Sequence, residues 1–271
     1  MSFTYDHLKW LEDTGTILVT ECGKEIPILK FSNDVNDSYA MTAWATHFRN
    51  HYCSDAQIDY LKNPSKSKSE YLLTEKFPGE KKPPGPSIRA GDFAEILIAD
   101  YLEFRRKFQV PRTRYERKAI SDESTKGSDV IAFKKNHGII SSDDELLIFE
   151  VKARAGENST DNVLQTAINH SVKDEVRLAE SLNAMKQRLL DKNDMNGVQL
   201  IDRFQREPDH PFKRSYGAAG VFSESSFNLI SFEKTSTLTH PKQKNLELIV
   251  IHCKQLMPLI HALYKRAADE A

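Results

Sequence analysis

Two charged residues stand at alternate positions within the apolar middle of residues 145–154 (ELLIFEVKAR), whose two end residues are also charged. The segment predicts a strand, in which Glu150 and Lys152 share one face while their neighbours occupy the other. Burying a carboxylate and an ammonium there is costly unless they are paired or bind a metal ion. The alternative is a pair of solvated charges flanking an edge strand. Two further E-x-K triplets, at 80–82 and 116–118, do not lie in apolar strands.

An aspartate stands just before a second predicted strand, residues 128–135 (SDVIAFKK). If this strand pairs with the first one as an antiparallel hairpin, with a polar tip at 136–144, paired residue numbers sum to about 280. Asp129 would then lie opposite Glu150 or its neighbour, with Cβ atoms about 5 Å apart. Two carboxylates so close repel each other unless a cation lies between them. The hairpin therefore predicts a cation site.

Carboxylates and a lysine in this arrangement suit phosphodiester hydrolysis. A divalent metal ion acidifies the attacking water and binds phosphoryl oxygens, and Mg²⁺ prefers oxygen ligands. A nearby ammonium orients the water and stabilises developing negative charge. We therefore expect Asp129 and Glu150 to bind Mg²⁺, with Mn²⁺ as a substitute, and Lys152 to assist the reaction.

Glu95 is a further acidic candidate. It lies in a helix predicted from a cap at Ser87 to about Phe108, surrounded by apolar residues. A carboxylate on a largely buried helix needs a partner. Two interpretations stay open: Glu95 binds the same metal ion, or it pairs with Arg89 or Arg105.

Basic residues gather in residues 105–118 (RRKFQVPRTRYERK), where seven cationic side chains accompany one acidic one. This stretch is a candidate phosphate-facing surface, with Arg112 and Arg114 as substrate-binding residues. The alternative is a solvated helix end followed by an exposed strand at 112–119. A net charge of −1 argues against a protein that coats nucleic acid by bulk electrostatics.

A long helix is predicted from a cap near residues 159–161 to about Asp191. Gln165, Asn169 and Lys173 form a polar stripe along it. We expect Gln165 or Lys173 to touch the scissile phosphate, although such stripes are more often simply solvated.

The chain divides by composition into three parts, with an α/β fold class overall. Residues 1–62 predict an N-terminal α/β extension that docks a partner, with two strands within 15–31. Residues 63–86, rich in Lys, Ser, Pro and Gly, predict a linker or long loop. Residues 87–271 predict the catalytic domain. Its expected elements after the E-x-K strand are the long helix, strands at 216–223 and 246–253, and a closing helix at 255–269.

Composition limits the class of protein further. No run approaches the about 20 apolar residues of a membrane helix, and the N-terminus lacks a signal-peptide pattern, so we expect a cytoplasmic protein without membrane contact. Three cysteines without a CxxC pair suggest neither disulfides nor a zinc site. A histidine metal centre is not expected either.

The ordered set of a helix with Glu95, a strand with Asp129, a strand with Glu150-x-Lys152 and a further helix resembles the PD-(D/E)xK nuclease superfamily. Its core order is αβββαβ, which residues 87–253 fit. Ser128 stands where the superfamily often has proline. The runs GDFAEILIADYLE, KGSDVIAF and LLIFEVKAR resemble more narrowly the HamA effector nuclease family of the Hachiman anti-phage system.

This resemblance implies a DNA-degrading nuclease of little sequence specificity. It implies a complex with a superfamily 2 helicase, HamB, which restrains the nuclease until it senses aberrant DNA. By matching position, Asp129 and Glu150 would ligate Mg²⁺, Lys152 would assist the water, and Glu95 would complete the acidic site. Two alternatives remain: a stand-alone restriction-type endonuclease that yields discrete fragments, and a non-catalytic adaptor that regulates a helicase.

Overall fold

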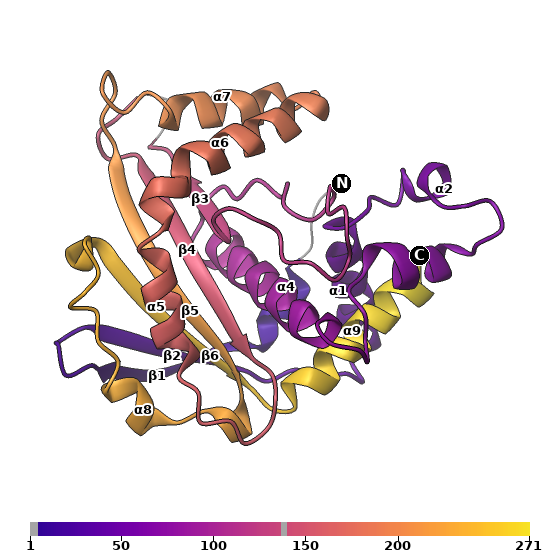
Figure 1. Ribbon diagram of the computed structural model, residues 1–271, viewed down its shortest axis with the longest axis horizontal. Coiled ribbons are helices and arrows are strands. Elements are labelled where there is room, and N and C mark those ends of the chain that lie inside the picture. Colours follow the sequence, from indigo (N-terminus) through magenta and orange to yellow (C-terminus); the bar gives the residue numbers. More distant parts are fainter. Residues whose placement is uncertain (1–4, 137–139) are drawn as a thin grey trace.

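One mixed sheet runs through the molecule in the computed structural model, which describes residues 5–136 and 140–271. Its strand order is β1-β2-β6-β5-β4-β3 (Figure 1). The two outer pairings, β1 with β2 and β3 with β4, are antiparallel, and the three inner ones are parallel. The strands are β1 (Leu11–Val19), β2 (Glu25–Phe31), β3 (Val130–Lys134), β4 (Glu145–Arg154), β5 (Lys213–Ser223) and β6 (Leu246–Cys253).

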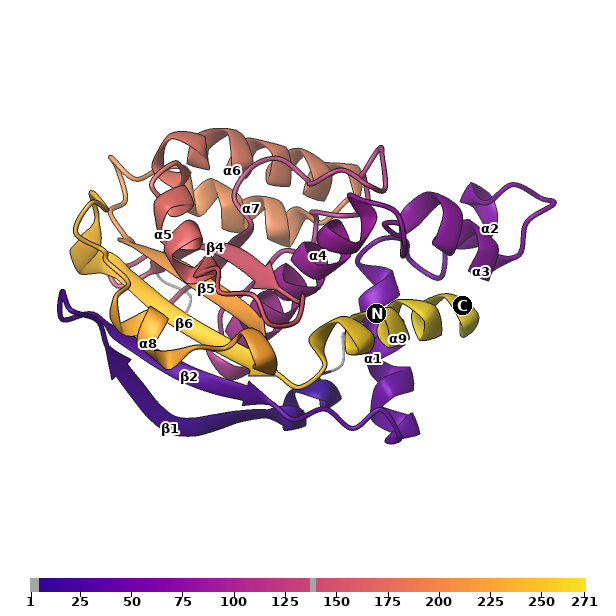
Figure 2. The ribbon, with the colours of Figure 1, turned by 60° about the horizontal axis from the view of Figure 1, so that its bottom comes forward.

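Helices cover both faces of this sheet. Helices α5, α6 and α7 gather on one side of it (Figure 2), and α4, α1 and α9 pack on the opposite face. The helices are α1 (Ser38–Asn50), α2 (Ile58–Leu61), α3 (Lys68–Tyr71), α4 (Gly85–Asp100), α5 (Val163–Ser171), α6 (Asp174–Asp191), α7 (Met195–Phe204), α8 (Leu229–Glu233) and α9 (Leu256–Asp269). The α/β class predicted from the sequence is confirmed.

Strand β4 lies inside the sheet and is buried on both faces. Phe149 and Val151 belong to the core under α4, whereas Leu146 and Ile148 belong to the core under α5. This two-sided burial explains why the segment is almost continuously apolar rather than alternating. The predicted strands at 145–154, 216–223 and 246–253 are confirmed.

The N-terminal strands belong to the same sheet as the rest of the chain. β2 pairs in parallel with β6, from Ile28 beside Val250 to Phe31 beside Cys253. Apolar side chains of β2 therefore extend both cores. The division into 1–62, 63–86 and 87–271 stays a prediction.

The stretch expected to be a linker or long loop contains regular structure. It includes α3 and a π-helical segment, Leu72–Lys76, and the side chains of Tyr71, Leu72 and Phe77 are buried. Three large side chains anchor this part of the chain to the core, although its overall composition is polar.

The strand expected at 112–119 does not form. After Gln109, which makes an isolated bridge with Phe133, the chain leaves the sheet edge. Its cations turn inward to ion pairs with carboxylates of α4. The charged side chains of this segment therefore form buried ion pairs and do not line the exposed face of a strand.

Two helix predictions also need correction, and one helix was not predicted. The long helix expected to reach Asp191 is two helices, α5 and α6, because the chain turns at Lys173, whose N–H bonds to His170 O. Helix α7 was not predicted, although Asp194 caps it. Ser87 lies inside α4, whose cap residue is Pro84.

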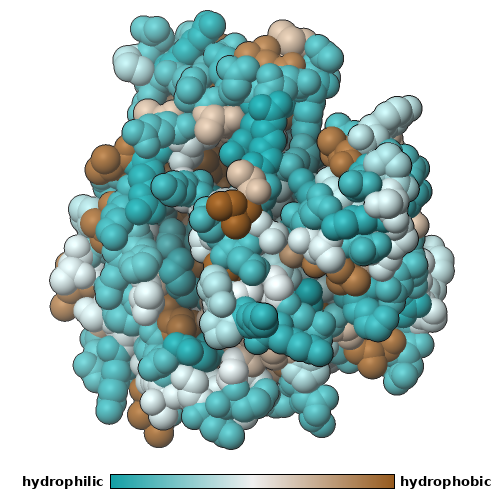
Figure 3. Space-filling view, turned by 45° about the vertical axis from the view of Figure 1, so that its right-hand side comes forward, coloured by the Kyte–Doolittle hydropathy of each residue, from teal (hydrophilic) through white to brown (hydrophobic). Residues whose placement is uncertain are grey.

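Hydrophilic side chains predominate on the face that Figure 3 shows, and hydrophobic ones are scattered over it. Across residues 5–136 and 140–271, no helix combines the length and apolar character needed to cross a bilayer.

A glycine opposite Phe149 lets β4 and β5 pack closely. A Cβ added at Gly217 would lie 2.3 Å from Phe149 Cε2, whereas one added at Gly91 in α4 would meet nothing within 4 Å. We expect Gly217→Ala to lower the free energy of unfolding by about 1–3 kcal/mol, because the buried ring must move. Gly91→Ala, the matched control, should raise it by about 0.5–1 kcal/mol. Urea denaturation checks both, and equal effects would contradict this packing.

Candidate functional site

The β3–β4 hairpin brings Asp129 beside Glu150. Val130 pairs with Phe149, so the preceding residue, Asp129, faces Glu150. The paired numbers sum to 279, which confirms the predicted register. Asp129 Oδ2 accepts a hydrogen bond of 2.9 Å from Val151 N, which fixes the carboxylate against β4. Residues 137–139, in the tip of the hairpin, lie outside the described residues.

Lys152 joins the two carboxylates. Its Nζ lies 2.5 Å from Glu150 Oε1 and 3.6 Å from Asp129 Oδ2. The Lys152 side chain is 28% exposed, whereas that of Glu150 is 5% exposed. The ammonium therefore lies at the boundary between the buried carboxylate and solvent, where an incoming ligand can reach it.

One oxygen of the Glu150 carboxylate is left without a partner within the described part of the chain. Its Oε2 atom is buried and has no hydrogen-bond partner among the described residues. Burial raises the pKa of Glu150 to about 7, the charge of Asp129 adds to this shift, and Lys152 opposes it. Burial alone would lower the pKa of Lys152, but Asp129 and Glu150 raise it above its ordinary value. The lysine stays charged, and the carboxylate favours a further cation.

Glu95 does not join Glu150. It comes from α4, which covers the sheet face opposite the one that Glu150 occupies. Arg114 pairs with it instead, with 2.7 Å between Arg114 Nε and Glu95 Oε2, and the Tyr115 hydroxyl donates to the same oxygen. Burial raises the pKa of Glu95, and Arg114 opposes this shift. Both earlier pairing candidates, Arg89 and Arg105, bind backbone oxygens of other segments.

Arg114 also holds Asp129. Its Nη2 lies 2.8 Å from Asp129 Oδ1, and it donates to the carbonyl oxygens of Thr125 and Ser128. The guanidinium thus links α4 to the start of β3. It neutralises the side of Asp129 that points away from Lys152.

The basic stretch forms a strap of buried ion pairs along α4. Arg112, Arg114 and Lys118 contact Asp100, Glu95 and Asp92, respectively. The order is reversed, so the strap runs antiparallel to the helix. The side chains of Arg112 and Lys118 are 7% and 3% exposed. This placement differs from the exposed phosphate-facing surface expected from the sequence.

The two candidates of the polar stripe separate. The Gln165 amide makes two hydrogen bonds with the backbone of Ser236: its Nε2 donates to Ser236 O, and its Oε1 accepts from Ser236 N. Lys173 is exposed at the turn between α5 and α6, close enough to His170 to lower the pKa of that histidine. Of the two candidates, Lys173 is therefore the one whose charge acts on His170, a neighbour of Glu150.

Two residues near the site escaped the sequence analysis. His170 Nδ1 lies 3.5 Å from Glu150 Oε1, and burial lowers the pKa of this half-exposed imidazole. Asp174 is completely buried, and neither oxygen makes a hydrogen bond of ordinary geometry within the described residues. Burial raises its pKa to about 6, the Ser128 hydroxyl opposes the shift, and Asp129 adds to it. Their position after the E-x-K strand was the available signal: His170 lies in α5, the first helix after β4, and Asp174 begins the next helix, α6.

A divalent cation fits this donor set. Asp129 and Glu150 offer hard oxygen atoms, and the unpartnered Glu150 Oε2 is the kind of buried group that an ion satisfies. Glu95, Asp129 and Glu150 do not form a compact trio. Among the described residues, one group of three has ligand atoms all within 4.8 Å, and it consists of His7, His47 and Asp100.

Fold and site together define a mixed α/β protein with a carboxylate–lysine site on a sheet hairpin. A family model for HamA matches residues 6–267, and the chain therefore belongs to the HamA family, the effector family of the Hachiman defence system. Comparison with curated proteins gives no match.

Two arginines three residues apart allow a matched test of the strap. Arg114 is 15% exposed and shared by two carboxylates, whereas Arg117 is 57% exposed and pairs with Asp191. We expect Arg114→Ala to cost about 3–5 kcal/mol in free energy of unfolding, because buried carboxylates lose their cation. Arg117→Ala should cost at most about 1 kcal/mol. Chemical denaturation measures both, and similar losses would refute a special role for Arg114.

Glu150 should make stability depend on pH. Its pKa of about 7 exceeds the ordinary value of 4.5, so the folded state binds the proton more tightly than the unfolded chain. The contribution of Glu150 to stability is therefore present at low pH and lost as pH rises through about 7. We expect the stability of Glu150→Gln relative to wild type to grow by more than about 1 kcal/mol between about pH 5 and pH 8. Urea unfolding at both pH values tests this, with the exposed Glu80→Gln as a control that should show no such trend.

Proposed function

We propose that this protein is a metal-dependent nuclease that hydrolyses DNA phosphodiester bonds with little sequence specificity, as the effector of an anti-phage complex. The observation that carries the proposal is the convergence of Asp129, Glu150 and Lys152 at the β3–β4 hairpin. Membership of the HamA family agrees with a defence effector.

Asp129 and Glu150 are the residues that would hold Mg²⁺, with Mn²⁺ as a substitute. A bound ion of this kind acidifies water and neutralises charge on phosphoryl oxygens. Asp129 is already oriented for this role by its hydrogen bond from Val151 N. Glu150 contributes the oxygen that lacks a partner.

Lys152 would orient the attacking water and stabilise negative charge on the phosphate, because its ammonium lies between the carboxylates and solvent. His170 stays neutral near neutral pH, since its pKa is lowered, and it stands beside Glu150 as a proton acceptor. Lys173, exposed at the next turn, is placed to attract the phosphate backbone.

The order of elements supports a PD-(D/E)xK core. Helix α4 is followed by the bridge at Gln109, by β3 and β4, by α5 and then by β5, which is parallel to β4. This order corresponds to αβββαβ when the bridge represents a reduced first strand. The absence of a full strand at 112–119 follows from the ion pairs that draw the chain toward α4.

The proposed complex includes a superfamily 2 helicase of the HamB type. Its support is the family, because a Hachiman effector works within a defence system. In this proposal the helicase restrains the nuclease and releases it on aberrant DNA.

A non-catalytic adaptor is the second candidate, and one observation favours it. Arg114 and Lys152 already neutralise much of the acidic charge without a metal ion. Calorimetric titration with Mn²⁺ separates the two functions: binding that is lost in Glu150→Ala supports the nuclease, and absence of binding supports the adaptor.

Cleavage assays test the nuclease proposal directly. The purified protein, alone and with its helicase partner, is incubated with Mg²⁺ and either plasmid DNA or RNA. We expect general degradation of DNA, and a loss of at least about 100-fold in rate for Glu150→Ala and for Lys152→Ala. Discrete fragments would indicate a restriction-type enzyme instead.

The chain contains its own control for this assay. Glu80 and Lys82 form the same E-x-K pattern on an exposed segment. The double variant Glu80→Ala/Lys82→Ala should cleave at the wild-type rate. Equal cleavage by wild type and Glu150→Ala would refute the assignment of the site.

A further inference from the structure

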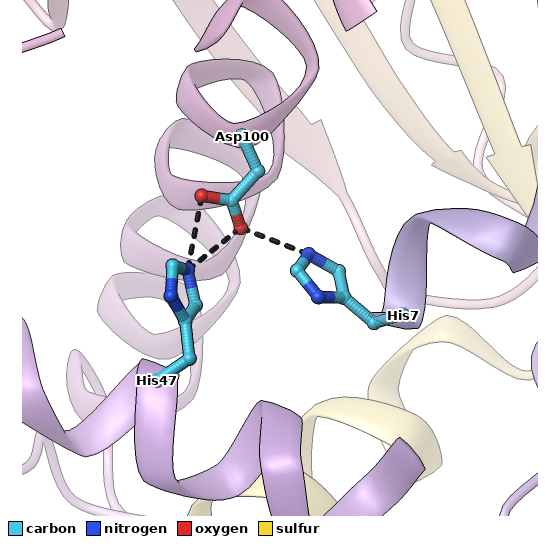
Figure 4. A group of neighbouring side chains, drawn as sticks. All are labelled: His7, His47 and Asp100. Atoms are coloured by element: carbon cyan, nitrogen blue, oxygen red, sulfur yellow. Dashed lines mark hydrogen bonds and ion pairs between the residues drawn. The ribbon is translucent and has the colours of Figure 1, made fainter. Parts of the chain in front are cut away.

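Three buried side chains from distant parts of the chain converge next to the end of α4 (Figure 4). They are His7 in the 3-10 helix Asp6–Trp10, His47 in α1, and Asp100 at the last residue of α4. His7 Nε2 lies 2.9 Å from Asp100 Oδ2, and His47 Nε2 lies 3.0 Å from both Asp100 oxygens. All three side chains are 0% exposed.

The ligand atoms of this trio have the spacing of a metal centre. One ligand atom from each residue lies within 4.8 Å of the others. Around tetrahedral Zn²⁺, with Zn–N bonds of about 2.0–2.1 Å, neighbouring ligand atoms are about 3.3 Å apart. The measured separations of Asp100 from the two imidazoles need to grow by only a few tenths of an ångström.

Burial and neighbouring charges act in opposite directions on the pKa values of this cluster. Burial lowers the pKa of His7, and Asp100 opposes that shift without overcoming it. Burial would raise the pKa of Asp100, but His47 and Arg112 hold it well below its ordinary value.

A candidate fourth donor, His51, directly follows the helix that carries His47. His51 Nε2 lies 3.2 Å from His47 Nε2, and burial lowers the pKa of His51 well below its ordinary value. His51 is the C-cap residue directly after α1, four residues beyond His47, and its backbone is still helical, so both side chains project from one side of the helix. The expectation of no histidine metal centre overlooked this spacing.

Arg112 completes the surroundings of Asp100. Its Nη2 lies 2.8 Å from Asp100 Oδ1 and 2.5 Å from Glu103 Oε2. Carboxylates that bind metal ions are commonly hydrogen-bonded on their other oxygen, so Oδ2 is the atom left for the ion. Glu103 compensates the guanidinium, and the group of Asp100, Glu103 and Arg112 keeps a net negative charge.

We propose that His7, His47 and Asp100 form a structural Zn²⁺ site separate from the Asp129–Glu150 site, and that His51, which lies outside the compact group of three, turns in as the fourth donor when the ion binds. The ion fastens the N-terminal 3-10 helix and α1 to the end of α4. It is closed to solvent, as in structural sites with four protein ligands. This proposal does not depend on nuclease activity.

Metal analysis of the full-length protein tests the site. The chain is purified after expression with added Zn²⁺, dialysed against a weak chelator, and assayed by elemental mass spectrometry. We expect about one Zn²⁺ per chain, falling below about a tenth in His7→Gln and in His47→Gln. Glutamine can still donate a hydrogen bond to Asp100, so these variants preserve the polar contact while removing the metal ligand.

Two control variants and a second measurement complete the test. His261→Gln, which changes a histidine bound to Arg89, and Glu150→Gln should both retain the zinc. Co²⁺ substituted into the wild type should show the intense visible absorption of tetrahedral coordination, which needs no variant to fold. A wild-type protein that takes up no Zn²⁺, or variants at His7 and His47 that keep it, would overturn the proposal. The cluster would then be a hydrogen-bonded group around Asp100.

Discussion

Strand β4 carries a carboxylate into the interior of a sheet, and the surrounding structure must compensate that charge. Glu150 is held between an apolar core, a neighbouring aspartate and a single lysine. Because Lys152 stands two residues further along the strand, it reaches the same face and neutralises part of the charge. Antiparallel pairing with β3 adds Asp129, whose two oxygens lie near Lys152 and Arg114. The proposed cation site rests on this pair of carboxylates and on the buried Glu150 Oε2, which has no hydrogen-bond partner among the described residues.

The same requirement shapes the other side of the sheet. Helix α4 buries three carboxylates, Asp92, Glu95 and Asp100, and a cation of the strap meets each of them. Because a buried charge without a partner is far costlier than a lost strand pairing, the strap leaves the sheet. Its path also sets the position of Arg114, which connects α4 with Asp129.

Two neighbouring cations of the strap connect the cluster of His7, His47 and Asp100 with the Asp129–Glu150 site. Arg112 contacts Asp100 beside the proposed zinc ligands, and two residues later Arg114 contacts Asp129 beside the proposed nuclease site. The N-terminal segment is thereby connected to the hairpin through α4 and the strap.

The amino-acid sequence by itself determined the local part of this site. An apolar strand with charges at alternate positions, an aspartate before the next strand and a short polar tip specify the hairpin, and its register follows from residue numbers alone. These features depend on neighbours in the chain, as do strands such as β5 and β6. Only the tertiary structure decided that Glu95 faces Arg114, that the basic stretch is buried, and that His7 meets His47 and Asp100. Those contacts join residues 12 to 93 positions apart, and the balance of burial and charge that selects them exists only once the chain has packed.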